Sequence, residues 1–453
     1  MNLRRNERLR NHLYRRTRGL RLEPLESRTL LSATPTDDSF RLAVFANSTE
    51  VEIPADLGVA SDNSTQALFT VDNSGKIYLD TPSGQKLGDL FDIWQNNAGQ
   101  AGNRADAILT EDQLLSHIED GTKTVQMYVN GQISTAFEDY VVQDGDQIVL
   151  VYGSNPVLSI NTNYGPIVVE LFETATPITV NNFLNYVNDG DYINSFFHRS
   201  VENFIIQAGG FKTNSTTFTD TDQFSNVPAD AQIQNEPGLH NVRGTIAMAK
   251  LPDLPNSATN QFFVNLSNNS SNLDNQNGGF TVFGQVLDMT TSDTIADLPI
   301  TPASSIDTTI SASDASLYSS LPLGTGNQLV VIQSIAGQGE ISGKKYFDEN
   351  GDGTYDDGED LLAGVTIYLD ANNNGLLDSG ETWTITGTDG SYRFQVPTGT
   401  YVVRSELTPG RIATSPVNPD SRTVVVQIGR EETGINFGEN LAAPSGIDLL
   451  AVS

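Results

Sequence analysis

The chain has 453 residues, and its 38% hydrophobic and 18% charged residues, 39 Gly and 19 Pro fit about three β-rich domains better than a helical bundle or a disordered chain. The formal net charge is −31, from 25 basic and 56 acidic residues, and so acidic a surface would repel phosphate backbones, which argues against nucleic-acid binding. The absence of cysteine excludes disulfides, thiolate metal sites and cysteine nucleophiles, and no membrane span is predicted, because no run of about 18 apolar residues occurs.

Residues 1–38 are predicted to be a disordered export or targeting segment. Residues 1–34 contain nine Arg and three Glu and therefore carry +6, which leaves −37 on the rest of the chain. The sequence Leu-Glu-Pro-Leu-Glu-Ser-Arg-Thr-Leu-Leu-Ser-Ala at 22–33 has the small-residue end of a secretory signal but no continuous apolar stretch. It resembles the LEPR-XLL motif of large surface and secreted proteins of planctomycete-like bacteria, which implies a secreted or cell-surface location. The alternative is a disordered basic tail.

Residues 39–154 are predicted to form a small α+β or β domain of unknown role. Segment 110–118 predicts a short helix with Thr110 as its N-cap, and Val129-Asn130-Gly131-Gln132 predicts a hairpin turn. No cluster of reactive residues occurs here, which favours a packing or presentation module. Alternation of apolar and polar residues predicts strands at 41–45, 76–79, 124–129 and 147–152.

Residues 155–337 form the central block, which begins at a boundary marked by Asn155-Pro156. A helix is predicted after Thr176, the expected N-cap, with Pro177 at its first position. The Ser-, Thr- and Asp-rich stretch 287–328 is expected to be a surface loop before a last strand at 329–333. A hairpin is predicted from two apolar stretches, 157–160 and 167–172.

Six short motifs follow one another in this block. They are Phe197-His198-Arg199, Phe204-Ile205-Ile206-Gln207-Ala208-Gly209, Gly244-Thr245-Ile246-Ala247-Met248-Ala249, Gln261-Phe262-Phe263-Val264, Leu273-Asp274 and Val282-Phe283-Gly284-Gln285-Val286. In this order they resemble the cyclophilin-type peptidyl-prolyl cis-trans isomerases. The resemblance implies a closed antiparallel barrel of eight strands with two helices, and catalysis at X–Pro peptide bonds.

Isomerisation of an X–Pro bond needs neither a nucleophile nor a metal, because no bond between heavy atoms breaks. Amide conjugation sets the barrier of about 18–20 kcal/mol, so a catalyst must hold the proline ring and favour the twisted amide. By resemblance, Arg199 is the main catalytic group, and its forked donors would hydrogen-bond near the prolyl nitrogen. The rest of the implied catalytic set is Phe204, Gln207, Gln261 and Phe263. The implied substrate contacts are Ile205, Ala249, Lys250, Leu273 and Phe280.

Each of these residues also has an ordinary structural role open to it, such as a surface ion pair for Arg199 or the core for Phe263. Their combination in family order favours the active site. His198 is expected to be structural and bonded to backbone.

Three positions depart from the family pattern. Lys250 stands where many members have Asn, and Phe280 stands where many have His. Asn272 stands where eukaryotic members have the Trp that binds cyclosporin. We therefore expect isomerase activity with weak cyclosporin sensitivity.

Residues 338–440 contain two sequences that fit a twelve-residue calcium loop, 22 residues apart, with Gly353 and Gly375 at the sixth position. Oxygen ligands without His or Cys argue against zinc or copper. The alternative is a pair of Asp-, Asn- and Gly-rich turns. The first predicted ligand set is Asp348, Asn350, Asp352, Thr354, Asp356 and Glu359. The second is Asp370, Asn372, Asn374, Leu376, Asp378 and Glu381.

The calcium loops are flanked by predicted strands at 364–369, 391–396 and 400–404, so they are not EF-hands. Four short segments resemble SdrD B-like repeats of bacterial surface proteins: 343–347, 362–365, 388–392 and 397–401. That resemblance implies a calcium-binding β-sandwich of the Cna-B type that acts as a stalk or spacer, followed by a tail at 441–453.

The leading hypothesis is a secreted or surface isomerase that assists folding of exported proteins. Its partners would be proline-containing polypeptides, with cell-surface components also possible, and calcium would be structural only. The alternative is a non-enzymatic surface protein whose barrel binds proline-containing segments.

Overall fold

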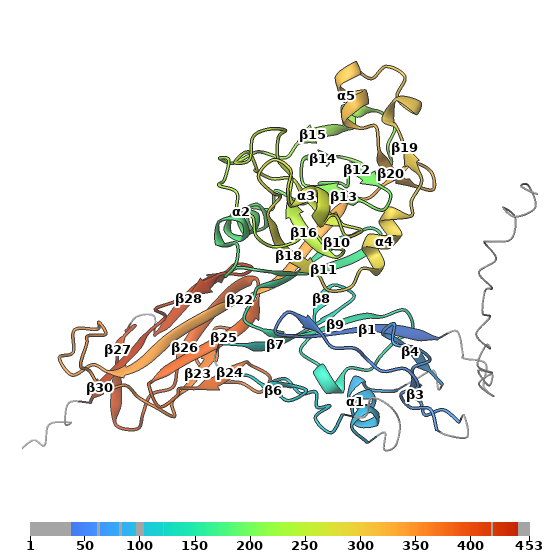
Figure 1. Cartoon of the computed structure of the whole chain (residues 1–453). Coiled ribbons are helices and arrows are strands. Elements are labelled where there is room, and N and C mark those ends of the chain that lie inside the picture. Colours follow the sequence, from blue (N-terminus) through green and yellow to red (C-terminus); the bar gives the residue numbers. More distant parts are fainter. Residues whose placement is uncertain are drawn as a thin grey trace, which may run out of the picture.

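The computed structural model describes residues 38–60, 64–80, 84–96, 104–120, 122–417 and 420–442. The predicted export segment and most of the predicted tail lie outside these residues. The described chain is mainly β and forms three lobes that follow one another along the sequence (Figure 1). Among the described residues, no helix has both the length and the apolarity that crossing a membrane requires.

The N-terminal lobe is built on one sheet with the order β3-β4-β1-β9-β7-β8, and β2 pairs with β1. Its core packs the sheet against helix α1 (Leu87–Asn96), which buries Phe91 and Trp94. The four strands predicted here are confirmed, as is the turn at Asn130-Gly131. The strands are β1 (Ser39–Ala46), β2 (Thr49–Glu50), β3 (Leu68–Phe69), β4 (Lys76–Leu79), β7 (Thr124–Val129), β8 (Gln132–Ile133) and β9 (Gln147–Gly153).

The helix predicted at 110–118 is wrong. This segment forms a short hairpin of β5 (Gln113–Leu114) and β6 (His117–Ile118). Leu115 adopts a φ of 57°, which a right-handed helix cannot accommodate, and its side chain is buried in the core. The helix of this lobe is α1, which the sequence analysis did not predict. Burial of the consecutive residues Leu114 and Leu115 overrides the local helical preference.

The central lobe begins with the predicted hairpin of β10 (Val157–Thr162) and β11 (Gly165–Leu171). Helix α2 (Pro177–Asn188) starts where it was predicted, but the side chain of Thr176 does not cap it. The Glu236 carboxylate instead accepts hydrogen bonds from the amides of Ile178 and Thr179, at 3.1 and 2.8 Å.

Regular pairing in the central lobe follows the path β12-β13-β17-β16-β18-β11-β10-β22. Strand ladders in the described chain do not close this path into a barrel. The remaining strands on it are β12 (Arg199–Val201), β13 (Ile205–Ala208), β16 (Thr245–Met248), β17 (Phe262–Asn265), β18 (Val282–Val286) and β22 (Ile332–Phe347).

The stretch 287–328 is not the surface loop that we expected. It contributes Tyr318, Leu321 and Leu323 to an apolar cluster around Phe196 and Phe218. The stretch is mostly polar, so its composition did not indicate that a few apolar residues would be buried and would attach it to the lobe. Its elements are α4 (Thr290–Ala296), β19 (Ile300–Thr301), a 3₁₀ turn (Ala303–Ser305), α5 (Ala312–Leu317), β20 (Leu321–Gly324) and β21 (Gln328–Leu329).

Strand β22 joins the central and C-terminal lobes without a break. Residues 332–337 pair with β10, and residues 338–344 pair with β25 (Ser391–Pro397). The glycines at the expected boundary therefore lie inside a strand. A Cβ on Gly339 would lie 2.2 Å from the carbonyl oxygen of Gln427, so glycine here permits close approach of a second chain segment.

The C-terminal lobe has two sheets over one apolar core, in which Ile341 and Phe394 meet Ile367 and Val403. The first sheet contains the second half of β22 with β25, β29 (Glu431–Glu432), β30 (Phe437–Leu441) and β27 (Arg411–Ser415). The second has the order β24-β23-β26-β28, with bounds Trp383–Ile385, Thr366–Leu369, Gly399–Ser405 and Ser421–Val426. The strands predicted in this region are confirmed.

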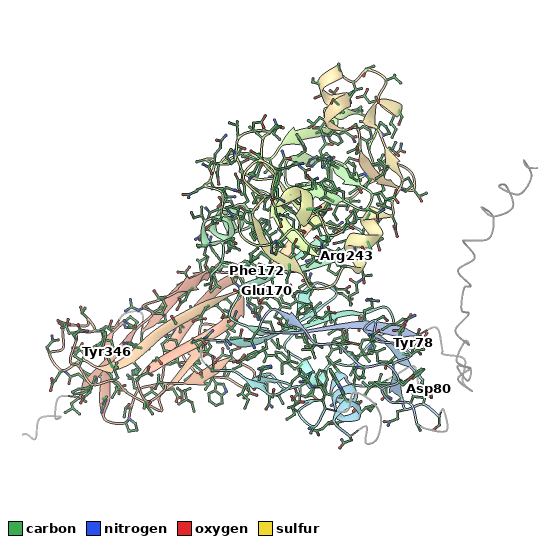
Figure 2. All side chains as sticks on the ribbon, in the orientation of Figure 1. Tyr78, Asp80, Glu170, Phe172, Arg243 and Tyr346 are labelled. Carbon is green, nitrogen blue, oxygen red and sulfur yellow. The ribbon has the colours of Figure 1, made fainter. Side chains whose placement is uncertain are left out.

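Both outer lobes are attached to the central lobe by specific contacts. The buried Glu170 carboxylate accepts from Ser48 Oγ at 2.6 Å, and from Asn155 Nδ2 and Gln285 Nε2 at 2.9 Å, where the lobes meet (Figure 2). Ile428 of the C-terminal lobe enters the central core, and its backbone exchanges two hydrogen bonds with the side chain of Asn188.

The first and last strands of the C-terminal lobe are joined by a buried ion pair. Lys345 Nζ on β22 lies 3.0 Å from Glu439 Oε2 on β30, and both side chains are at most 1% exposed. Glu439 also accepts from Arg411 Nη1 at 3.0 Å. Removal of one partner from such a pair leaves a buried charge uncompensated.

We predict that Glu439→Gln lowers the free energy of unfolding of the C-terminal lobe by about 3–5 kcal/mol, because the Lys345 ammonium stays buried without its counterion. Urea denaturation of the full chain measures this change. As a control, Asp139→Asn breaks the exposed Lys86–Asp139 pair and leaves stability nearly unchanged, because water solvates both charges. Equal effects of the two substitutions would contradict the prediction.

Candidate active site

One cross-strand row of the central sheet brings together residues of the predicted site. Arg199 on β12 is opposite Gln207 on β13, which is opposite Phe263 on β17. The row continues from Phe263 to Ala247 on β16 and Val282 on β18. Opposite residues of an antiparallel pair project to the same face, so strand register places Arg199 and Phe263 on one face of the sheet, with Gln207 between them.

Hydrogen bonds between side chains hold the polar end of this row. Gln207 Nε2 donates to Gln261 Oε1 at 2.8 Å, and Gln207 Oε1 lies 3.4 Å from Arg199 Nη1. Within the described chain no other hydrogen bond occupies the Arg199 guanidinium, so most of its donors remain available. Arg199 is half-buried, and burial lowers its pKa from the ordinary value of 12.5, although an arginine stays charged in proteins.

The apolar end of the row is a single hydrophobic cluster. The predicted residues in it are Ile205, Phe263 and Leu273, which are buried, and Phe204, Ala249 and Phe280, which are partly buried. The sequence analysis did not assign Phe172, Ala247 and Val282 to it. The last two lie in motifs that were recognised, and their register with Phe263 could have identified them.

The backbone groups of Ala249 and Lys250 differ in whether they are already hydrogen-bonded within the protein. The Ala249 amide donates to the carbonyl oxygen of Gln261 at 2.9 Å, so this N–H is not available to a peptide. In the described chain neither the N–H nor the C=O of Lys250 is hydrogen-bonded. The backbone groups of Lys250 are therefore available to hydrogen-bond an extended peptide, whereas the Ala249 amide is not.

His198 is buried between the active row and the core. Burial and the neighbouring charge of Arg199 lower its pKa to about 3, against a backbone hydrogen bond with Phe196 that raises it. Its ring meets Phe211 edge to face, with centroids 4.9 Å apart. An imidazole that is neutral throughout the physiological range and lacks solvent contact fits a structural role.

Asn272, at the position of the cyclosporin-binding Trp, lies on α3 (Ser270–Leu273) with its side chain exposed. Its amide oxygen accepts from Gln276 Nε2. This side chain is therefore turned to solvent and to the residues that follow α3, whereas the neighbouring Leu273 and Phe280 belong to the apolar cluster.

The two predicted calcium loops repeat one hydrogen-bond pattern. The first aspartates, Asp348 and Asp370, each accept the amide of the glycine at the sixth position, Gly353 or Gly375, at 2.8 Å. The last glutamates, Glu359 and Glu381, each accept two backbone amides of their own loop.

The donor sets of the loops contain only oxygen ligands, which suit calcium. Among the described residues, however, no group of three or more His, Cys, Asp or Glu side chains is gathered to hold a metal ion. Asn372 and Asn374 donate their amides to Asp378, and Arg404 Nε donates to Asp370 at 2.6 Å. Thr354 and Leu376 occupy the seventh position of their loops, where the predicted calcium ligand is the backbone carbonyl.

Known proteins resemble the central lobe. A family model for "Cyclophilin type peptidyl-prolyl cis-trans isomerase/CLD" matches residues 157–312. A peptidyl-prolyl cis-trans isomerase of Acinetobacter baylyi is 40% identical over 150 residues, which are 32% of this chain and 74% of that relative. Peptidyl-prolyl cis-trans isomerase B of Escherichia coli is 38% identical over 136 residues, 29% of this chain and 78% of that relative.

A crystal structure of a Cryptosporidium parvum cyclophilin type isomerase matches with a TM-score of 0.29 and 23% identity, over 40% of this chain and 96% of that one. The residues that the family model matches contain the row from Arg199 to Val282. On these matches, the chain belongs to the cyclophilin-type peptidyl-prolyl cis-trans isomerase family and is an isomerase.

Proposed function

We propose that Arg199, Phe204, Gln207, Gln261 and Phe263 form the catalytic site, and that the enzyme acts on X–Pro bonds of exported or surface proteins. The observation that carries the site assignment is the cross-strand row in which Gln207 lies between Arg199 and Phe263. A fixed positive charge thus adjoins an apolar pocket, as binding of a proline ring next to a polarised amide requires.

In the proposed mechanism, each group of the site has one role in binding or in catalysis. The proline ring packs against Phe263, and the backbone groups of Lys250 hydrogen-bond the extended peptide. Arg199 donates to the prolyl nitrogen as the amide twists, because the nitrogen lone pair is localised only in the twisted state. Gln207 holds the guanidinium at the edge of the pocket. Stabilisation that appears only in the twisted state accelerates the reaction.

Arg199→Ala is expected to lower kcat for a proline tetrapeptide by about 10²–10³-fold, the loss usual for a donor aimed at a transition state. A protease-coupled isomerisation assay on the full chain measures this. Arg104→Ala, in the N-terminal lobe, removes an arginine that pairs with Asp106 and leaves the rate unchanged. If wild type and Arg199→Ala both matched the uncatalysed rate, the barrel would be a binding module for proline-containing segments and the catalytic assignment would be wrong.

We infer further that the central sheet closes into the eight-stranded barrel with two helices. Support comes from the segment before β12, where Phe196 bridges to Val331 and the Phe197 amide donates to the carbonyl oxygen of Val330 at 2.9 Å. These bonds link the two ends of the strand path. Closure would remove the exposed edges that an open sheet presents.

We also propose that the C-terminal lobe is a calcium-stiffened β-sandwich of the SdrD B-like type. The support is the hydrogen-bond pattern shared by the two loops, together with a φ near 80° at Gly353 and Gly375. When bound, calcium would neutralise carboxylates that otherwise repel one another. The predicted ligands include side-chain amide and backbone oxygens as well as carboxylates. A calcium site in these loops therefore does not require three or more carboxylates close together.

Millimolar calcium is expected to raise the melting temperature of the C-terminal lobe in the full chain, because a ligand that binds only the folded state stabilises it. The double variant Glu359→Gln and Glu381→Gln removes the last ligand of each loop and should abolish the shift. Glu406→Gln, at an exposed carboxylate outside both loops, should retain it. No shift in wild type, or an equal shift in all three proteins, would count against the sites.

The proposed location outside the cytoplasm rests on the sequence of residues 1–38 and on the resemblance of 338–440 to surface-protein repeats. Fractionation of the producing cells checks it, and recovery of the protein only in the cytoplasm would contradict it.

Weak cyclosporin sensitivity is the predicted consequence of Asn272. The side chain is exposed and bonded to Gln276, so the indole contact that the drug uses in eukaryotic members has no counterpart. Inhibition of the isomerase assay should require micromolar or higher cyclosporin, and Asn272→Trp should increase sensitivity. Nanomolar inhibition of the unmodified protein would contradict this prediction.

A further inference from the structure

The wall of the proposed proline pocket is carried by a tightly turned rim loop at 274–280. Three consecutive residues of this loop, Asn277, Gly278 and Gly279, have φ values of 49°, 75° and 79°. This left-handed run directs backbone carbonyl groups to the inside of the loop. A Cβ on Gly279 would lie 3.0 Å from the carbonyl oxygen of Asp274, so the turn has no room to relax.

The ammonium group of Lys250 occupies the inside of this loop. Lys250 Nζ donates to the carbonyl oxygens of Gly279 at 2.6 Å and Asn277 at 2.9 Å, and to Asn235 Oδ1 at 3.1 Å. An ammonium has three donors, so this arrangement uses all of them. The side chain is half-buried and turned into the rim, which leaves only its backbone facing a substrate.

The same ammonium lies 4.8 Å from the centroid of the Phe280 ring. A partly desolvated cation at this distance from an aromatic face is attracted to it. Phe280 in turn meets Phe263 edge to face, with ring centroids 5.9 Å apart and an interplanar angle of 72°. Phe263 belongs to the row that contains Arg199. A continuous set of contacts thus runs from Lys250 through Phe280 to the proline pocket.

Asn235 holds the same loop together with Lys250, from which its Oδ1 accepts a hydrogen bond. Its Nδ2 donates to the carbonyl oxygens of Gly278 and Gly279, both at 2.9 Å, and its Oδ1 accepts from Thr281 Oγ1 at 2.8 Å. Asn235 alone leaves the carbonyl of Asn277 without a partner among these groups. Lys250 supplies that partner, and it is the only charged group in this set of contacts.

We infer that Lys250 is a positioning residue of the isomerase, whose side chain fixes the rim loop and sets Phe280 as a wall of the proline pocket. This inference rests on the proposed catalytic site. A preformed wall lowers the cost of binding the proline ring in the planar and twisted states alike, so its loss weakens substrate binding more than turnover.

The test measures kcat and KM separately for a proline tetrapeptide. Lys250→Met keeps the length of the stem and removes all three donors, and it is expected to raise KM about 3- to 10-fold with kcat within about twofold of wild type. Lys250→Gln keeps amide donors and should raise KM less. Lys344→Met is the matched control, because it removes a cation 5.0 Å from the ring of Tyr355 in the C-terminal lobe and should change neither constant.

A double-mutant cycle shows whether Lys250 acts through Phe280. If it does, Lys250→Met adds little to the KM of Phe280→Ala, because the wall that it positions is already absent. Additive effects on KM would overturn the inference, as would an unchanged KM with a lowered kcat and melting temperature. An active wild type with unchanged KM in Lys250→Met and Lys250→Gln refutes only the positioning role. An inactive wild type refutes the proposed function and the positioning role together.

Discussion

The arrangement of the molecule depends on β22, a 16-residue strand that belongs to two lobes. Its first six residues complete the central sheet on β10, and the following residues begin the C-terminal lobe on β25. A strand that is hydrogen-bonded along its whole length leaves no free linker between the lobes. Gly337 and Gly339 serve this junction by admitting Ile428 and Gln427 at close range.

The strands from β12 to β18 carry the row of Arg199, Gln207 and Phe263. The outer lobes are attached through Glu170 on β11, through Gln285 on β18, which also belongs to the row's strands, and through the continuous strand β22. The buried Lys345–Glu439 pair then ties the far end of the shared strand to the last strand of the chain.

From the sequence, the residues of the cross-strand row were predicted more accurately than the secondary structure around them. The motifs around Arg199 and Phe263 occur in a fixed order, and strand register converts that order into proximity. Ala247 and Val282 lie in motifs that were recognised, but assigning them to the row required the pairing of β16 with β17 and β18. The helix expected at 110–118 and the loop expected at 287–328 failed because tertiary burial of Leu115 and Tyr318 overrides local composition. The boundary expected between 337 and 338 falls inside β22, where Gly337 and Gly339 permit close packing.

The central claim is that the row around Arg199 turns a proline-binding pocket into a catalyst. Exchange spectroscopy by NMR tests it directly, because one experiment reports both binding of a proline peptide and its cis–trans exchange. The account predicts that wild type accelerates exchange, whereas Arg199→Ala still binds the peptide but catalyses exchange about 10²–10³-fold more slowly. Binding without accelerated exchange in wild type, or undiminished exchange in Arg199→Ala, would contradict it.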